Sequence, residues 1–194
     1  MDNPSLILHA VDRRLEHEVR LVLYGRSAVC LGFDNSPPEA AKTQDVDAII
    51  SVAQSHELEG DSGFWTAVEG ANAELVARGL YITHLFSEAE IFLRRNWHDH
   101  LVLVTRPALR WLRLFRPATV DLILTKMMRG NDPQDMADAG FMIRHDRITE
   151  AELLQAFEQM KPVELVELRD AFERAKPVVL KLARELSQGD HQPP

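Results

Sequence analysis

Two aspartates one residue apart, Asp45 and Asp47, are the first residues whose type and spacing suggest chemistry. The apolar run that contains Asp47, "VDAIIS", predicts a strand. Side chains alternate between the two faces of a strand, so both carboxylates are expected on one face of a sheet. Two such acids repel each other unless the run is a solvated strand edge or a cation lies between them. Mg²⁺ favours a couple of carboxylates together with substrate phosphate oxygens. We therefore interpret Asp45 and Asp47 as candidate metal ligands.

A small-residue turn, Gly25-Arg26-Ser27, lies between a predicted strand, "VRLVLY", and a short predicted helix that reaches Gly32. The N-terminus of a helix presents unpaired N–H groups and the positive end of the helix dipole, and both favour an anion. Glycine permits a sharp turn and close approach of a phosphate. The turn followed by the acidic pair predicts a phosphate site at Gly25, Arg26 and Ser27 beside Mg²⁺ or Mn²⁺, which is the arrangement of metal-assisted phosphoryl or nucleotidyl transfer.

The elements that must position these residues follow from hydrophobic periodicity and turn chemistry. Strands are predicted at 19–24, 46–51, 80–86, 100–104 and 111–115, and helices at 6–20, 27–32 and 64–78. From Pro117 onwards the pattern is helical, with a capping box at Thr149 to Glu152. The predicted fold is α+β: a mixed β-sheet flanked by helices, with a helical C-terminal part. We expect an α/β core at 1–116, a helical region packed on it at 117–188, and a frayed tail at 189–194.

Composition limits the classes of function. The net charge of −8 argues against a broad attraction to nucleic acid, although six arginines lie between Arg94 and Arg116. We favour solvated arginines over an anion site for that region. The apolar runs are too short to span a membrane, and the first residues do not resemble a signal peptide. Cys30 is the single cysteine and cannot form an internal disulfide, so a cytoplasmic location is expected.

Two stretches carry a resemblance to a known family. "YGRSAVCLGF" followed by "KTQDVDAII" resembles the first signature of the nucleotidyltransferase superfamily, and "RPATVDLILTKMMRGNDPQDMADAGFMI" is similar to a helical segment of the same proteins. The likeness is closest to small bacterial nucleotidyltransferase-like proteins of unknown function and more distant to AbiEii-type toxins. It covers 20–143. By position, Lys126 matches the family's lysine, and Asp135 and Asp138 match its second acidic pair.

The resemblance implies a nucleotidyltransferase-like sheet and Mg²⁺-dependent transfer of a nucleoside monophosphate from an NTP. The acceptor would be an RNA, a protein or a small molecule, and the toxin likeness implies an antitoxin partner. Asp45 and Asp47 would be catalytic metal ligands. Lys126 would neutralise the leaving pyrophosphate, and Asp135 or Asp138 would orient Lys126 or accept a proton. From the residues alone, a lysine closing a helix C-terminus and acids at a helix N-terminus are the plainer interpretations.

The sequence also departs from the family pattern. Arg26 stands where the family commonly has a second glycine or serine. His84 occupies the strand position where a third carboxylate is expected, and Glu88 and Glu90 follow just beyond it. Two carboxylates can hold one Mg²⁺ yet position a second one poorly. A catalytically inactive binding or regulatory protein with the same fold is therefore the alternative hypothesis.

Overall fold

The computed structural model describes residues 1–161 and 165–189 and divides into two compact units. Unit 1 consists of Met1–Glu88 and Leu101–Arg116, and unit 2 of Ala89–His100 and the chain from Pro117 onwards. The segment Ala89–His100 thus belongs with the C-terminal helices, although the sequence placed it in the α/β core. From residue 190 on, the predicted frayed tail lies outside the described residues. The fold class is α+β, as predicted.

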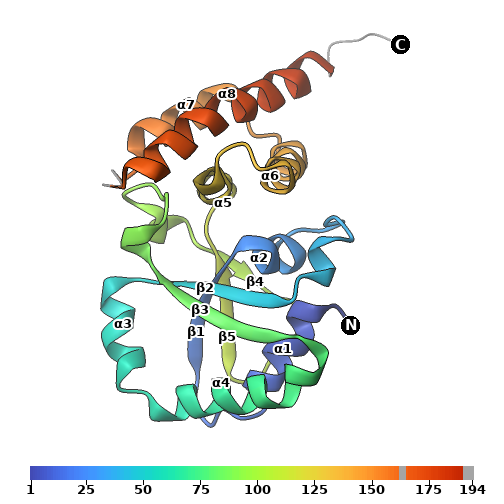
Figure 1. Ribbon diagram of the computed structural model, residues 1–194, viewed down its shortest axis with the longest axis vertical. Coiled ribbons are helices and arrows are strands. Elements are labelled where there is room, and N and C mark those ends of the chain that lie inside the picture. The colour runs from blue at the N-terminus through green and yellow to red at the C-terminus, as the bar shows by residue number, and fades with distance from the viewer. Residues whose placement is uncertain (162–164, 190–194) are drawn as a thin grey trace. The chain divides into compact units, whose positions relative to one another are not determined.

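Unit 1 is built on a mixed five-stranded sheet with the order β3-β2-β1-β5-β4 (Figure 1). Strand β1 is antiparallel to β2 and parallel to β5, and β2 is parallel to β3. The predicted hairpin is present as the antiparallel pair β4 and β5. The strands span Val19–Tyr24 (β1), Asp45–Ile50 (β2), Tyr81–Ser87 (β3), Val102–Val104 (β4) and Leu112–Arg116 (β5).

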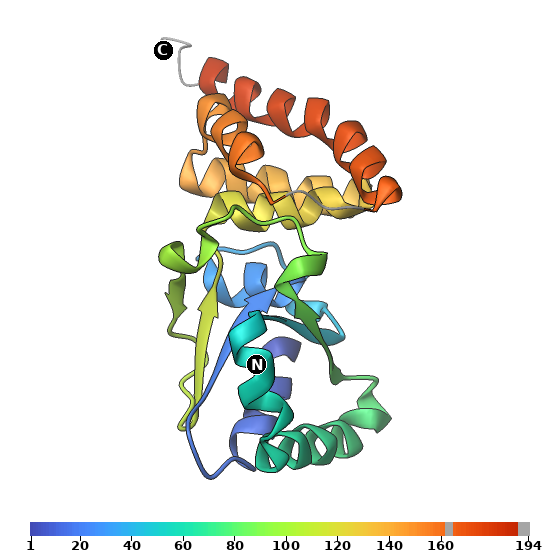
Figure 2. The same ribbon diagram turned by 90° about the vertical axis from the view of Figure 1, so that its left-hand side faces the viewer.

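The helices of unit 1 pack on this sheet because alternate strand residues are apolar. Val19, Leu21 and Leu23 share one face of β1 and are buried. The strands are contacted by four helices: α1 (Asn3–Asp12), α2 (Gly25–Gly32), α3 (Val52–Glu59) and α4 (Ser62–Leu75) (Figure 2). The sequence did not predict α3. It also extended α1 to residue 20, whereas the helix ends at Asp12.

Asp12, the last residue of α1, makes a long-range contact with the start of β5. Its carboxylate is 7% exposed and accepts backbone N–H groups of Arg110, Trp111 and Leu112 at 2.9, 2.7 and 2.8 Å. Burial acts to raise the pKa of Asp12, but these three hydrogen bonds outweigh it and hold the pKa below its usual value. One side chain at the end of α1 thereby fixes the entry to β5, about a hundred residues away along the chain.

We predict that Asp12→Ala lowers the free energy of unfolding by about 3 kcal/mol, because three buried N–H groups lose their acceptor. The folded-state pKa lies below the unfolded one, so this stabilisation is present near neutral pH and is lost as pH falls through the folded pKa. Urea unfolding of the wild type and of Asp12→Asn should therefore differ at pH 7 and converge in acid. The exposed neighbour Glu16 supplies the control, Glu16→Gln; a difference that stays constant with pH would contradict the role given to Asp12.

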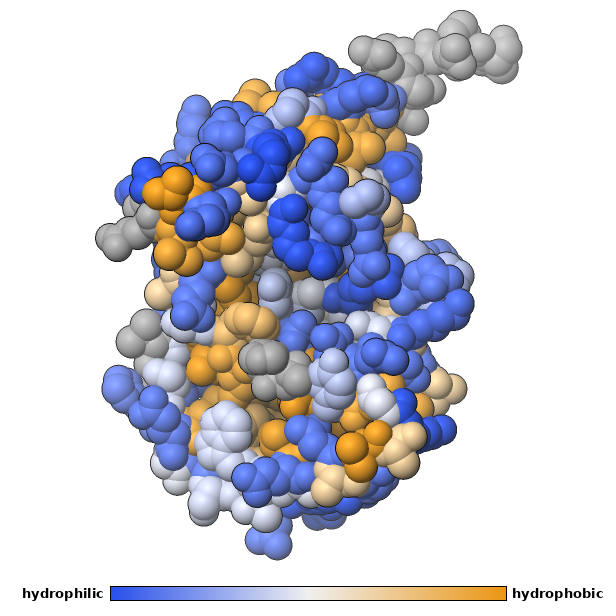
Figure 3. All heavy atoms as spheres, in the orientation of Figure 1, coloured by the Kyte–Doolittle hydropathy of each residue, from blue (hydrophilic) through white to orange (hydrophobic). Residues whose placement is uncertain are grey.

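Unit 2 contains the helices α5 (Thr119–Lys126), α6 (Pro133–Asp146), α7 (Glu150–Gln159) and α8 (Val166–Gly189). The predicted capping box of α7 is confirmed, since Thr149 and Glu152 exchange both hydrogen bonds. Figure 3 shows that hydrophilic side chains predominate on the face in view, with apolar ones scattered among them. No helix among the described residues is long and apolar enough to cross a membrane.

The segment Ala89–His100 is attached to unit 2 by a buried ion pair and by backbone hydrogen bonds. The backbone N–H of Arg94 donates to Asp121 at 2.9 Å, and its guanidinium pairs with the same carboxylate at 2.7 Å. Asp121 is fully buried on α5. The N–H of Lys161 donates to the carbonyl of Leu93 at 2.9 Å, next to the bridge between Arg94 and Met160. These contacts account for the assignment of this segment to the helical unit.

Candidate functional site

The turn that was predicted to bind phosphate lies beside Asp47. Strand β1 pairs with β2 so that Tyr24 stands opposite Asp47. The next residue, Gly25, begins α2 with a φ of 64°. A Cβ placed on Gly25 would lie 3.5 Å from Oδ2 of Asp47. The positive φ requires glycine, since other L-residues are strained there. A carboxylate oxygen thus borders the backbone of the turn.

Asp45 and Asp47 share one face of the sheet by strand alternation, and both are half-buried. Asp45 is oriented by Thr43, whose hydroxyl donates to Oδ1 at 2.7 Å. The pairing of β2 with β3 shifts register between Val46 and Ala48, where β3 has one residue more than β2, so Asp47 keeps its place in the alternation of β2 and stands opposite the irregularity. Bulges are frequent next to active sites, where they redirect a side chain. The sequence interpretation overlooked Thr43, although a hydroxyl two residues before the first aspartate was visible in the sequence.

The hydroxyl of Ser27, which was predicted to contact phosphate, forms a hydrogen bond within the turn. Its side chain is 1% exposed, and its hydroxyl donates to the carbonyl of Tyr24 at 2.9 Å. The hydroxyl therefore closes the strand-to-helix turn from inside the protein, which leaves the backbone N–H groups of the first helical turn as the anion-binding donors. Arg26 is half-buried in that turn. Main-chain donors bind an anion whatever side chains they carry, so the turn keeps this capacity without the serine hydroxyl.

The two glutamates that follow β3, Glu88 and Glu90, do not add a third carboxylate to Asp45 and Asp47. Ser87 pairs with Ile50 at the far end of β2, so Glu88 lies more than about 10 Å along the strands from Asp47. Glu88 is buried, and Glu90 belongs to unit 2. The side chain of His84 lies outside the described part of the structure. Among the described residues, no group of three or more His, Cys, Asp or Glu side chains is arranged to hold a metal ion.

Lys126, Asp135 and Asp138 come together in unit 2 as a buried cluster. Lys126 Nζ lies 3.1 Å from Oδ1 of Asp135 and 2.7 Å from Oδ2 of Asp138. Arg129 adds a second cation, with Nε 2.6 Å from Oδ2 of Asp135. Lys126, Asp135 and Asp138 are each no more than 5% exposed. The cluster pairs two cations with two anions, and it joins the end of α5 to the beginning of α6.

This geometry bears on both interpretations of these residues, the catalytic one and the one based on helix ends. Lys126 ends α5 and Asp135 lies in the first turn of α6, as the plainer interpretations expected, but the Lys126 side chain is enclosed and not at the surface. The predicted role for Lys126, neutralising a leaving pyrophosphate, would require its ammonium to leave two carboxylates inside unit 2. Buried ions of this kind are stable only as a complete set. We therefore interpret the three residues as the ionic core of unit 2.

The arginines of the Arg94 to Arg116 region are divided between the two units. Arg94 belongs to unit 2, whereas Arg106, Arg113 and Arg116 belong to unit 1. Arg116 is 7% exposed, donates to the carbonyl of Gly32 at 3.0 Å and lies 4.0 Å over the ring of Phe33. Arg113 pairs with Glu18 at 3.1 Å. Several members thus serve in structural contacts, and Arg116 is buried, rather than all being solvated.

Cys30 has no feature of a reactive thiol. Its side chain is buried on α2, and burial together with the nearby carboxylate of Asp2 raises the pKa of the thiol to about 11. The thiolate is the nucleophilic form, so the thiol is inert near neutral pH. Cys30 packs as a small apolar residue in the helix that follows the phosphate-binding turn.

We predict that Lys126→Met lowers the free energy of unfolding by about 3–5 kcal/mol, because it leaves Asp135 and Asp138 buried with one cation fewer. The matched control is Lys181→Met, which removes an exposed lysine paired with Glu185 at 3.6 Å; this change should leave stability within about 0.5 kcal/mol of the wild type. Guanidinium unfolding followed by circular dichroism measures both. Equal stability of the two variants would show that the cluster does not support the fold.

Comparisons of the chain with protein-family models, with curated protein sequences and with solved structures gave no significant match.

Proposed function

We propose that the chain binds a nucleoside triphosphate with Mg²⁺ on the face of the sheet that carries Asp45 and Asp47, as a nucleotidyltransferase-like protein. The observation that carries the proposal is the 3.5 Å approach of Asp47 to the side-chain position of Gly25. A metal on the carboxylate and a phosphate on the turn would then be neighbours. This is the arrangement that metal-assisted transfer of a phosphoryl or nucleotidyl group requires.

The donor set suits Mg²⁺, or Mn²⁺, better than a softer metal. Asp45 and Asp47 offer hard carboxylate oxygens, and Mg²⁺ favours one or two carboxylates together with phosphate oxygens. When bound, the ion would neutralise charge on the phosphates and polarise the bond to the leaving pyrophosphate. The protein itself would bind the phosphates and orient the metal ligands. The N–H groups at the start of α2 would hold the phosphates, and Thr43 would keep Asp45 turned towards the ion.

The proposed catalytic set is smaller than the one that the resemblance implies. It keeps Asp45 and Asp47 as metal ligands and the main chain of Gly25 to Ser27 as the phosphate site. It leaves out Lys126, Asp135 and Asp138, because their charges are satisfied inside unit 2. Arg26 lies in the turn and is the cation that the chain places nearest to the phosphates along its sequence.

We expect full-length protein to bind ATP or another NTP by calorimetry only with Mg²⁺ or Mn²⁺ present, and Asp47→Asn to weaken that binding at least about tenfold. The control is Asp34→Asn, which changes an exposed acid of unit 1 that pairs with Arg106 at 3.4 Å. Both variants should keep the wild-type melting profile. The absence of metal-dependent binding of all four NTPs at millimolar concentration by folded protein would reject the proposed function.

We assign Thr43 as a positioning residue for Asp45. Thr43→Val should raise the Mg²⁺ concentration at half-maximal nucleotide binding about tenfold. Thr43→Ser keeps the hydroxyl and should restore the wild-type value. The readout is the Mg²⁺ concentration at half-maximal nucleotide binding, which a change in general stability would not shift selectively. Equal Mg²⁺ requirements for the valine and serine variants would contradict this assignment.

A non-catalytic binding or regulatory protein is the second candidate. It is favoured by the metal-ligand geometry, since the described residues supply two carboxylates on the sheet face and no third member for a metal cluster. Two-metal chemistry needs ligands for both ions. The two candidates separate when labelled NTP is incubated with the protein and Mg²⁺. Release of pyrophosphate indicates transfer or hydrolysis, whereas metal-dependent binding without release favours the second.

A further inference from the structure

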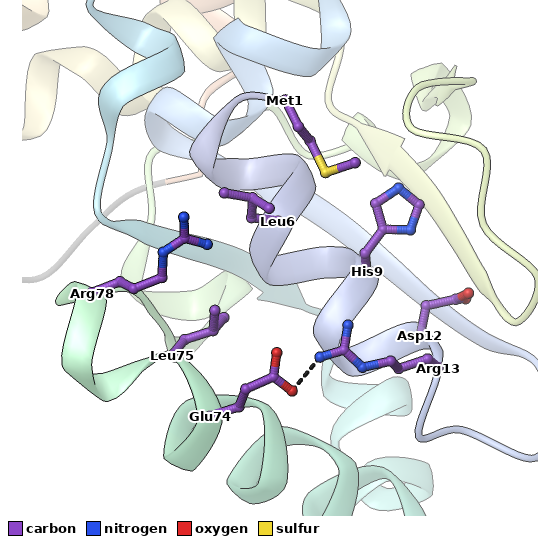
Figure 4. Close-up of a pocket in the computed structure, with 8 residues that line it drawn as sticks. All are labelled: Met1, Leu6, His9, Asp12, Arg13, Glu74, Leu75 and Arg78. Atoms are coloured by element: carbon purple, nitrogen blue, oxygen red, sulfur yellow. Dashed lines mark hydrogen bonds and ion pairs between the residues drawn. The ribbon is translucent and has the colours of Figure 1, made fainter.

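A second concave site lies in unit 1, apart from the Asp45 and Asp47 face. It has a volume of about 370 Å³ and is formed by α1, the end of α4 and the short helix η2 (Val76–Arg78) (Figure 4). This volume falls within the usual range of small-molecule sites, roughly 300–1,000 Å³. Its lining combines apolar side chains with charged ones: Met1, Leu6 and Leu75 together with His9, Asp12, Arg13, Glu74 and Arg78.

Both acids of this cavity are already satisfied by other groups. Glu74 pairs with Arg13 and, at 2.6 Å, with Arg14. The hydrogen bonds from Arg13 and then Arg14 lower the pKa of Glu74 to about 2, so it stays ionised and bound to them. The carboxylate oxygens of Asp12 accept hydrogen bonds from three backbone N–H groups at the start of β5. Neither carboxylate is therefore available as the acceptor for a cationic ligand.

Among the cationic side chains of the cavity, Arg78 differs from the two acids because it has no ion-pair partner among the described residues. Arg78 is exposed at the end of η2, and within residues 1–161 and 165–189 no ion pair to its guanidinium is formed. Figure 4 shows Arg78 on one side of the cavity and His9 on the other, with Leu6 and Leu75 between them. Leu75 is 3% exposed and Leu6 is half-buried, so they form an apolar floor. The cavity thus offers a guanidinium beside apolar surface.

We propose that this cavity binds a small organic carboxylate with an aliphatic body, its carboxylate on Arg78 and its chain over Leu6 and Leu75. A guanidinium matches a carboxylate with two parallel N–H···O bonds, which a neutral or cationic head cannot accept. The chain carries a net charge of −8, and Arg13 of the cavity is already paired with Glu74, so the attraction for an anion comes from the guanidinium of Arg78. Burial of the aliphatic body on the floor supplies the non-directional part of the binding.

The test uses three probes with the same eight-carbon chain and different heads: octanoate, octanol and octylammonium. Their binding to the full chain is measured by ligand-observed NMR and calorimetry at pH 7. We expect octanoate to bind at least about tenfold more tightly than octanol, and octylammonium to bind more weakly than either. Equal affinities for octanoate and octanol, or no detectable octanoate binding at millimolar concentration, would overturn the proposal.

Two variants locate the site. Arg78→Gln should reduce octanoate affinity to that of octanol and leave octanol unchanged, because it removes only the charged head's partner. Arg113→Gln changes another exposed arginine of unit 1 and should alter neither affinity. The melting temperature of Arg78→Gln should equal that of the wild type, since Arg78 is exposed. If the two variants retained octanoate equally, the carboxylate would not bind at Arg78 and the assignment would be wrong.

Discussion

The antiparallel pairing of β1 with β2 is the constraint on which the candidate site depends. It places Tyr24 opposite Asp47, so the residue after Tyr24 must turn away from the sheet directly beside a carboxylate. Only glycine adopts the positive φ of that turn without strain, and Gly25 does so. A slip of one residue would bring Val46 to this position and move both aspartates to the other face. Register, more than any single contact, therefore creates the proposed metal and phosphate site.

Unit 2 depends on charge compensation away from water. Asp121 pairs with Arg94, and Asp135 and Asp138 pair with Lys126, so the buried acids of α5 and α6 each contact a cation. Arg129, which is largely exposed, adds a further cation to Asp135. Such groups are costly to bury singly and tolerable as sets with good geometry. The Arg94 pair also explains the chain path, because it retains the segment Ala89–His100 with the helices before the chain returns to the sheet at β4.

The sequence predicted the parts of the molecule that local rules control. The five strands, the shared face of Asp45 and Asp47, and the capping box at Thr149 follow from period two and from cap chemistry, and all are present. The long-range role of Asp12 was missed because its partners lie almost a hundred residues later in the chain. The same limit applies to Arg94, whose partner on α5 cannot be inferred from spacing.

The candidate site was predicted in outline and misjudged in detail for a related reason. The resemblance placed Asp135 or Asp138 beside Lys126, and both contact it, yet spacing could not show that all three side chains are buried. Ser27 was expected to contact phosphate, but a hydroxyl in a tight turn often bonds to a carbonyl a few residues away, as it does to Tyr24. Thr43 was overlooked because its role depends on the loop geometry before β2.

The two acidic pairs show why residue type alone does not define function. Asp135 and Asp138 are enclosed, and both lie within 3.1 Å of the Lys126 ammonium, while Arg129 supplies a second cation to Asp135. Asp45 is half-buried, and the hydroxyl of Thr43 orients it without neutralising it. A carboxylate that is oriented but keeps its negative charge at an accessible face of a sheet can still gain from a divalent ion, whereas a compensated one gains little. Burial and compensation together therefore give the helical pair a structural role, and they favour the sheet for the proposed metal site.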